Sequence, residues 1–333
     1  MTLPKLSFSL LLSLLAITPA LLAESPKSTA AAPAPEILRY DWKDESRQRP
    51  VPVLIYLPAK AVAATPAPVI VFSHGLGGSR ENYTYLGRYW AEAGYVSVHV
   101  QHKGSDDRIW RDAKPSDRMN AVRLAAMNPA NALARPKDVS FVIDELTRLN
   151  AADSSPLRGR LDLNRIGVAG HSFGGFTAMA IAGQSFMAEE PRMIDPRVKA
   201  VIQMSAPVIG GQQLSESKFD AIRIPVFHMT GTKDDSPVGE TMAADRRVPF
   251  DRMRHSDTCL VIFQDGDHMI FSGRMQPDAS RLKQDEAFQK LICKGTTAFW
   301  DAQLRGKVDS KKWFYDGGFI SLLGAAGTFE HKV

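Results

Sequence analysis

Cysteine is scarce in this chain, because Cys259 and Cys293 are the only two among its 333 residues. At most one intrachain disulfide can therefore form. Two separate buried thiols are the alternative, and export of the chain favours the bridge. A bridge between these positions would close a loop of about 34 residues and constrain the unfolded chain by roughly 3–4 kcal/mol.

Blocks of like charge are also missing. Lysine and arginine total 41 against 36 acidic residues, which gives a net charge of +5. Because the basic residues are spread along the sequence, they indicate a mildly basic surface and argue against a nucleic-acid partner. Metal motifs are missing too. The acidic stretches 233–235 and 265–268 match neither a zincin helix nor an EF-hand loop, so we expect solvated loops there and no metal.

No apolar run is long enough for a typical membrane span. The N-terminal run covers about residues 6–17, follows Lys5, and is succeeded by the small residues Ala20 and Ala23. This layout is typical of a secretory signal peptide, and serines and a proline interrupt the run. The sequence therefore predicts a signal peptide over 1–23, cleaved after Ala20 or Ala23. The mature protein would be periplasmic or secreted, without a stable membrane anchor.

Beyond the signal peptide the chain has no internal repeat. Residues 24–36 are rich in Ala, Pro and Ser and predict a flexible tether, followed by a single domain over 37–333. In that domain, strand-like apolar runs alternate with helix-like segments. The strand-like runs are 51–58, 67–75, 95–102, 165–172, 198–207, 224–231 and 258–266. The helix-like segments include 80–94, 135–150, 173–183 and 285–306. This alternation predicts an α/β fold with a mostly parallel sheet and helices on both faces.

One strand-to-helix junction carries a serine between glycines, in Gly170-His171-Ser172-Phe173-Gly174. In a nucleophile elbow the positions two before and two after the serine approach each other closely, so only small residues fit there. The alternative is a serine that merely caps a helix after an ordinary turn. With an apolar strand before it and an Ala/Gly-rich helix after it, Ser172 is predicted to be a nucleophile.

A serine nucleophile needs a histidine base and an acid that orients it. In hydrolases with this elbow the acid and then the histidine follow the serine. His268 comes directly after the strand-like run 258–266, whereas His255 precedes that run and His331 lies near the C-terminus, where we expect fraying. The acid is expected after the run 224–231. Asp234, three residues after Gly231, is favoured there, and Asp235 is the alternative.

The oxyanion of the reaction needs N–H donors. The backbone N–H of Phe173, directly after the serine, is one predicted donor. The second usually comes from a loop after an earlier strand, and the glycine-rich loop 74–78 fits that place. The backbone N–H of Leu76 is predicted to be that donor.

Four stretches together resemble the α/β-hydrolase superfamily: VIVFSHGLGGSRENY, VAGHSFGG, MTGTKDDSP and FQDGDHMIF. Within it the chain resembles dienelactone-hydrolase-like proteins, platelet-activating factor acetylhydrolases and cutinase-like polyester hydrolases. The resemblance implies an α/β-hydrolase fold with an eight-stranded sheet over about 37–306, and a triad of Ser172, Asp234 and His268. There are departures. Dienelactone hydrolases use cysteine as nucleophile, and platelet-activating factor acetylhydrolases take their acid after the preceding strand.

The sequence thus predicts an exported serine carboxylic ester hydrolase that works through an acyl-enzyme and needs no cofactor. Its substrate would be a small-molecule, lipid or polyester ester. The segment 103–134 is expected to shape the pocket, with Trp110, Met119 and Met127 as a candidate apolar wall for the acyl group. Packing of these side chains onto the domain is the alternative. A peptidase or amidase on the same triad, and a non-catalytic binding protein with a hydrolase fold, are the alternatives.

Overall fold

The computed structural model describes residues 34–186, 193–273 and 279–333, and all of them belong to the unit Pro33–Val333. The predicted signal peptide over 1–23 lies outside the described residues, as does the predicted tether up to residue 33. Among the described residues, no helix combines the length and the apolar character needed to cross a bilayer.

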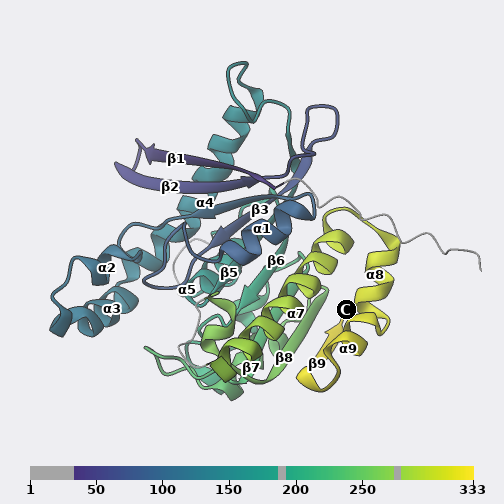
Figure 1. Ribbon diagram of the computed structural model, residues 1–333. Helices are drawn as coiled ribbons and strands as arrows, with labels where there is room; N and C mark the ends of the chain where they lie inside the picture. Colours follow the sequence, from purple (N-terminus) through teal and green to yellow (C-terminus); the bar gives the residue numbers. More distant parts are fainter. Residues whose placement is uncertain (1–33, 187–192, 274–278) are drawn as a thin grey trace, which may run out of the picture. The chain divides into compact units, whose positions relative to one another are not determined.

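The described residues form one mixed sheet of nine strands in the order β1-β2-β4-β3-β5-β6-β7-β8-β9 (Figure 1). The five neighbouring pairs from β4 to β8 are parallel, and the pairs β1–β2, β2–β4 and β8–β9 are antiparallel. The strands are β1 (Glu36–Asp44), β2 (Arg49–Leu57), β3 (Ala67–Ser73), β4 (Val96–Val100), β5 (Leu161–His171), β6 (Val198–Met204), β7 (Val226–Lys233), β8 (Thr258–Asp267) and β9 (Gly327–Lys332). The mostly parallel α/β architecture agrees with the prediction.

The predicted count of eight strands is wrong, because the C-terminal segment adds a ninth. β9 pairs with β8 from Phe263–Gly327 to Thr258–Lys332, so the expected fraying near His331 is wrong as well. The Nε2 atom of His331 lies 2.7 Å from a carboxylate oxygen of Asp257, which fixes this end of the strand. β9 was not predicted because it is short and polar, and because its stability comes from pairing with β8.

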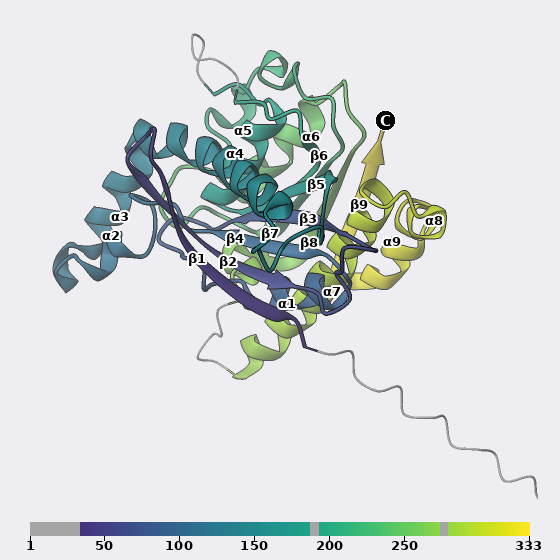
Figure 2. The ribbon, with the colours of Figure 1, turned by 90° about the horizontal axis from the view of Figure 1, so that it is seen from above.

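Helices cover the two faces of the sheet (Figure 2). On one face, α4 and α5 pack against the strands, and on the other, α1 and α7 do so. The helices are α1 (Thr84–Glu92), α2 (Arg108–Arg111), α3 (Arg118–Met127), α4 (Pro129–Ala151), α5 (Phe173–Ala182), α6 (Val248–Arg252), α7 (Ala279–Gln303), α8 (Val308–Tyr315) and α9 (Gly318–Leu323).

The continuous apolar runs of the central strands follow from this double cover. In β3, Val69 and Val71 belong to the core cluster with α4 and α5, whereas Ile70 and Phe72 belong to the cluster with α1 and α7. Because successive side chains of a strand point to opposite faces, a strand covered on both sides needs apolar residues at every position. The carboxyl ends of β5, β7 and β8 consequently meet along one edge of a rigid sheet.

The predicted disulfide is wrong, because Cys259 and Cys293 are both free thiols. Cys259 lies on β8 and Cys293 on α7, both buried in the cluster with α1 and α7. Burial raises the pKa of both thiols, and that of Cys293 rises to about 12. Glu92 also raises the pKa of Cys293, and Asp257 that of Cys259, so the two thiols have different neighbours. Here each cysteine fills the core as a small apolar side chain.

Candidate active site

Ser172 stands between β5 and α5 with strained backbone angles, φ 56° and ψ −119°. A Cβ atom on Gly170 would collide with the carbonyl oxygen of Gly174, and one on Gly174 with the carbonyl oxygen of Ser73. Both positions therefore require glycine, as the elbow motif predicts. The strained turn holds the serine hydroxyl at the end of the strand, where it is partly exposed.

The structure brings Ser172, His268 and Asp234 together. Ser172 Oγ lies 2.9 Å from His268 Nε2, and His268 Nδ1 lies 2.8 Å from Asp234 Oδ1. An ionised carboxylate only accepts hydrogen bonds, so the Nδ1–H of the imidazole donates to Asp234 and Nε2 accepts from the serine hydroxyl. The alternative acid, Asp235, is exposed and instead accepts a hydrogen bond from the backbone N–H of Ala243.

Asp234 is fully buried and its oxygens are surrounded by donors. The hydroxyl groups of Ser205 and Thr230 donate to Oδ2, and Arg246 Nη2 lies 3.3 Å from Oδ1. Arg246 is buried as well, and its other nitrogens donate to backbone carbonyls, including those of Ser205 and Asp234. Burial lowers the pKa of Arg246, while Asp234 opposes that shift. This cation was not predicted from the sequence, since 12 residues separate it from Asp234.

The two predicted oxyanion donors flank the serine. Leu76 and Phe173 both line the same cavity as Ser172. In the loop 74–78 the N–H of Gly77 donates to the carbonyl oxygen of Ser105, and that of Gly78 to the carbonyl oxygen of Gly75. These two amides and that of Gly75, which donates to the hydroxyl oxygen of Tyr83, hold the loop 74–78 in place.

His171, the residue before the serine, links the loop 74–78 to His268. The backbone N–H of Gly75 donates to the hydroxyl oxygen of Tyr83, 3.1 Å away. The hydroxyl of Tyr83 lies 2.9 Å from His171 Nδ1, and His171 Nε2 lies 2.9 Å from the carbonyl oxygen of His268. Because a carbonyl oxygen only accepts hydrogen bonds, the Nε2–H of His171 donates to the carbonyl oxygen of His268. Nδ1 of His171 then accepts a hydrogen bond from the hydroxyl of Tyr83. These contacts join the backbone of the loop 74–78 to that of His268.

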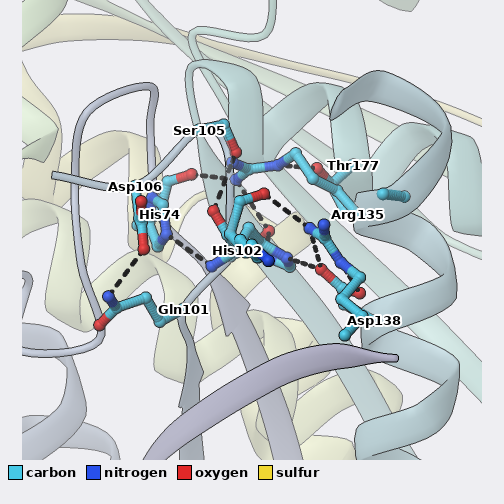
Figure 3. Close-up of polar contacts among 12 residues, drawn as sticks. His74, Gln101, His102, Ser105, Asp106, Arg135, Asp138 and Thr177 are labelled. Carbon is cyan, nitrogen blue, oxygen red and sulfur yellow. Dashed lines mark hydrogen bonds and ion pairs between the residues drawn. The ribbon is translucent and has the colours of Figure 1, made fainter. Parts of the chain in front are cut away.

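A second Ser–His–Asp array lies beneath that loop. Ser73 Oγ lies 2.7 Å from His102 Nε2, and His102 Nδ1 lies 3.0 Å from Asp138 Oδ2 (Figure 3). All three side chains are inaccessible to solvent. Burial lowers the pKa of His102 to about 3, so its imidazole is neutral at physiological pH. Because Ser73 cannot meet a substrate, we assign this array to the scaffold.

Arg135 lies beside the buried array (Figure 3), and it donates a hydrogen bond to the hydroxyl of Ser73, 3.2 Å away. It donates to the carbonyl oxygen of His74 and to the hydroxyls of Ser105 and Thr177, the last two at 2.8 and 2.9 Å. Burial lowers its pKa to about 9, which leaves the guanidinium charged at neutral pH. Its guanidinium also lies 4.6 Å from the ring centroid of Phe173. Arg135 therefore ties the loop 74–78 to α4 and α5.

Two cavities meet at Ser172. The larger, of about 850 Å³, runs along α5 and is called the α5 cavity here. The smaller, of about 640 Å³, contains His268 and is called the His268 cavity. Trp110 lines the His268 cavity, and its indole N–H donates to the carbonyl of Gly77 at 2.8 Å, so it also supports the loop. The expected single wall of Trp110, Met119 and Met127 is divided, because Met127 lines the α5 cavity.

The described residues contain no group of histidine, cysteine, aspartate and glutamate that could hold a metal ion.

Comparisons with known proteins find matches among the platelet-activating factor acetylhydrolases. A family model described as platelet-activating factor acetylhydrolase, isoform II, matches residues 57–116, which include the loop 74–78. The platelet-activating factor acetylhydrolase of Cavia porcellus is 27% identical over 34% of this chain and 31% of its own length. That of Canis lupus familiaris is 24% identical over 51% of this chain and 41% of its own length.

The chain resembles the platelet-activating factor acetylhydrolases. The resemblance stated from the motifs is thereby confirmed, and it supports a hydrolase acting on esters. The matches span less than half the length of these relatives. The family-model match ends before Ser172, so the roles of that residue, Asp234 and His268 rest on geometry.

Proposed function

We propose that this protein is an exported serine hydrolase that cleaves carboxylic esters through an acyl-enzyme. The observation that carries the proposal is the hydrogen-bonded series Ser172–His268–Asp234 at the point where two cavities meet. The relatives' names describe hydrolysis of an acetyl group, which supports esters as the substrate class. Export rests on the predicted signal peptide over 1–23, and the domain would begin with β1.

The geometry supports the following course of reaction. His268 Nε2 takes the hydroxyl proton of Ser172 as the oxygen attacks the ester carbonyl. Asp234 accepts from Nδ1–H throughout, which holds the reactive tautomer and stabilises the imidazolium. The backbone N–H groups of Leu76 and Phe173 bind the oxyanion. His268 then protonates the leaving alkoxide, and a water activated by the same imidazole releases the acid.

The test separates the two Ser–His–Asp arrays. Ser172→Ala should lower kcat for p-nitrophenyl acetate and butyrate by about 10⁴-fold or more and abolish labelling by an organophosphonate. Ser73→Ala is the matched control, because it removes a hydroxyl from the buried array, and it should still be labelled. Absence of turnover and labelling in the wild type would overturn the proposal. Labelling that depends on Ser73 would show that Ser73, and not Ser172, is the nucleophile.

The acid is tested in the same assay. Asp234→Asn should cost about 10³–10⁴-fold in kcat, because an amide can favour the unreactive tautomer of His268. Asp235→Asn removes one exposed carboxylate and should change kcat little. A larger loss for Asp235→Asn would contradict the assignment. Turnover of amides in preference to matched esters would make the protein an amidase instead.

A further inference from the structure

Two cavities open from Ser172, and only one of them is lined by His268. Leu76, Ser172 and Val238 line both cavities. His268 lines only the smaller one, and Phe173 only the larger. Helix α3 spans the two, since Met119 and Val122 line the His268 cavity and Ala126 and Met127 the α5 cavity. This asymmetry orients a substrate.

The proton that His268 takes from Ser172 must reach the leaving oxygen of the ester. That transfer needs the leaving oxygen within hydrogen-bond reach of Nε2. An alcohol held in the α5 cavity would be on the side that His268 does not line. The alcohol must therefore leave through the His268 cavity, and the acyl group, on the other side of the carbonyl carbon, must extend into the α5 cavity.

The α5 cavity has the chemistry of an acyl site. Phe176 and Phe186 pack in its wall with tilted rings whose centroids lie 3.7 Å apart, and Val208 and Leu133 add aliphatic surface. Its volume of about 850 Å³ is in the upper part of the range for drug-sized ligands. The acidic side chains at its border, Glu240 and Asp245, disfavour an anionic ligand. The cavity therefore suits a bulky, neutral and apolar acyl group.

The His268 cavity is built differently. The polar side chains of Ser79 and Asn82 and the basic ones of Arg111 and Arg118 line it, next to apolar residues that include Trp110. Arg111 pairs with Asp107 at 3.1 Å, whereas Arg118 has no ion pair within the described ranges. Such a surface suits the polar alcohol of an ester.

We infer that this enzyme cleaves esters that join a bulky apolar acid to a polar alcohol, with the acid in the α5 cavity and the alcohol in the His268 cavity. The inference rests on the proposed function and adds the direction in which the substrate lies. It differs from an acetyl ester specificity, because an acetyl group would leave most of the α5 cavity empty.

The test compares p-nitrophenyl esters from acetate to octanoate. In the wild type, kcat/KM should rise with acyl length, by at most about fourfold per added methylene. Ala132→Trp places a large ring in the α5 cavity from a partly exposed position on α4. It should lower the ratio of octanoate to acetate activity by about tenfold or more. Ala130→Trp, on the exposed side of the same helix, should leave that ratio unchanged.

The alcohol side is tested with octanoate esters of ethanol and glycerol. Val122→Trp narrows the His268 cavity. It should lower the activity on the glycerol ester relative to that on the ethyl ester, while the ratio of octanoate to acetate activity stays as in the wild type. Each readout is a ratio within one variant, so partial unfolding does not mimic the effect. A flat acyl profile in the wild type, or an acyl ratio that responds to Val122→Trp and not to Ala132→Trp, would overturn the inference. Either result leaves the ester hydrolase standing, whereas a wild type without turnover or labelling removes both proposals.

Discussion

The hydroxyl oxygen of Tyr83 lies 2.9 Å from Nδ1 of His171, and this contact joins the segment that follows β3 to the end of the neighbouring strand β5. Through it the backbone N–H of Gly75 is connected to the carbonyl oxygen of His268. The loop 74–78 and His268 are therefore connected by one series of hydrogen bonds. Preorganised donors contribute to catalysis only when they keep their position relative to the nucleophile and base.

We predict that Tyr83→Phe lowers kcat by about 10- to 100-fold with little change in KM, because the loop 74–78 loses its link to His171. Steady-state kinetics on p-nitrophenyl butyrate would measure this. Tyr89→Phe removes a hydroxyl from the same region without breaking a hydrogen bond between described residues, and serves as the control. Equal kinetics for Tyr83→Phe and the wild type would show that the link does not position the donors.

We expect Arg135 to contribute to the stability of the folded protein. Arg135→Met leaves the carbonyl of His74 and the hydroxyls of Ser105 and Thr177 without their donor. We expect a loss of about 3 kcal/mol in the free energy of unfolding, measured by denaturant titration. Arg123→Met, at an exposed position without an ion pair within the described ranges, should stay within about 0.5 kcal/mol of the wild type. Similar losses in the two variants would contradict a structural role for Arg135.

Acid should unfold the protein through its buried histidines. Burial lowers the pKa of His99, His102 and His228 to about 3, and holds that of His74 well below its usual value. The unfolded chain regains ordinary histidines, which bind protons below about pH 6.5. Between that pH and 3 the unfolded state binds more protons, so stability falls as pH falls, by up to about 1.4 kcal/mol per pH unit for each histidine.

Denaturant titrations between pH 7 and pH 4.5 would measure this slope. His228→Phe removes one of the four buried histidines. Unfolding of this variant should therefore take up one proton fewer, and its stability should fall less steeply as pH falls. A slope that is the same in His228→Phe and the wild type would contradict the linkage for that residue.

The free cysteines make a prediction opposite to that of a bridge. Dithiothreitol should leave the Tm unchanged, because no disulfide is available to reduce. Burial and the raised pKa should also keep both thiols unreactive towards Ellman's reagent in the native state, and two thiols should react after unfolding. A fall in Tm on reduction would show that a disulfide is present and would contradict this prediction.

The sequence predicted those parts of the site that depend on local rules. Ser172, Asp234 and His268 could be placed because each follows a recognisable apolar strand, and parallel strands carry their carboxyl ends to one edge. Arg135 and Arg246 could not, because their partners are fixed only when helices and loops close over the sheet. His171 was visible inside the motif, but its contact with Tyr83 depends on the entry angle of α1. Cys259 and Cys293 were misjudged because spacing along the chain says nothing about which way a side chain points.

The pairing of β9 with β8 has a consequence for synthesis of the protein. β8 comprises residues 258–267, but its outer edge is covered by residues 327–332. During translation the strand that delivers His268 is therefore complete while one row of its hydrogen-bonding groups is still open. An open edge can recruit another strand. Expression as a chain cut before residue 327 should accordingly yield aggregates, and supplying the missing strand as a peptide during refolding should suppress them.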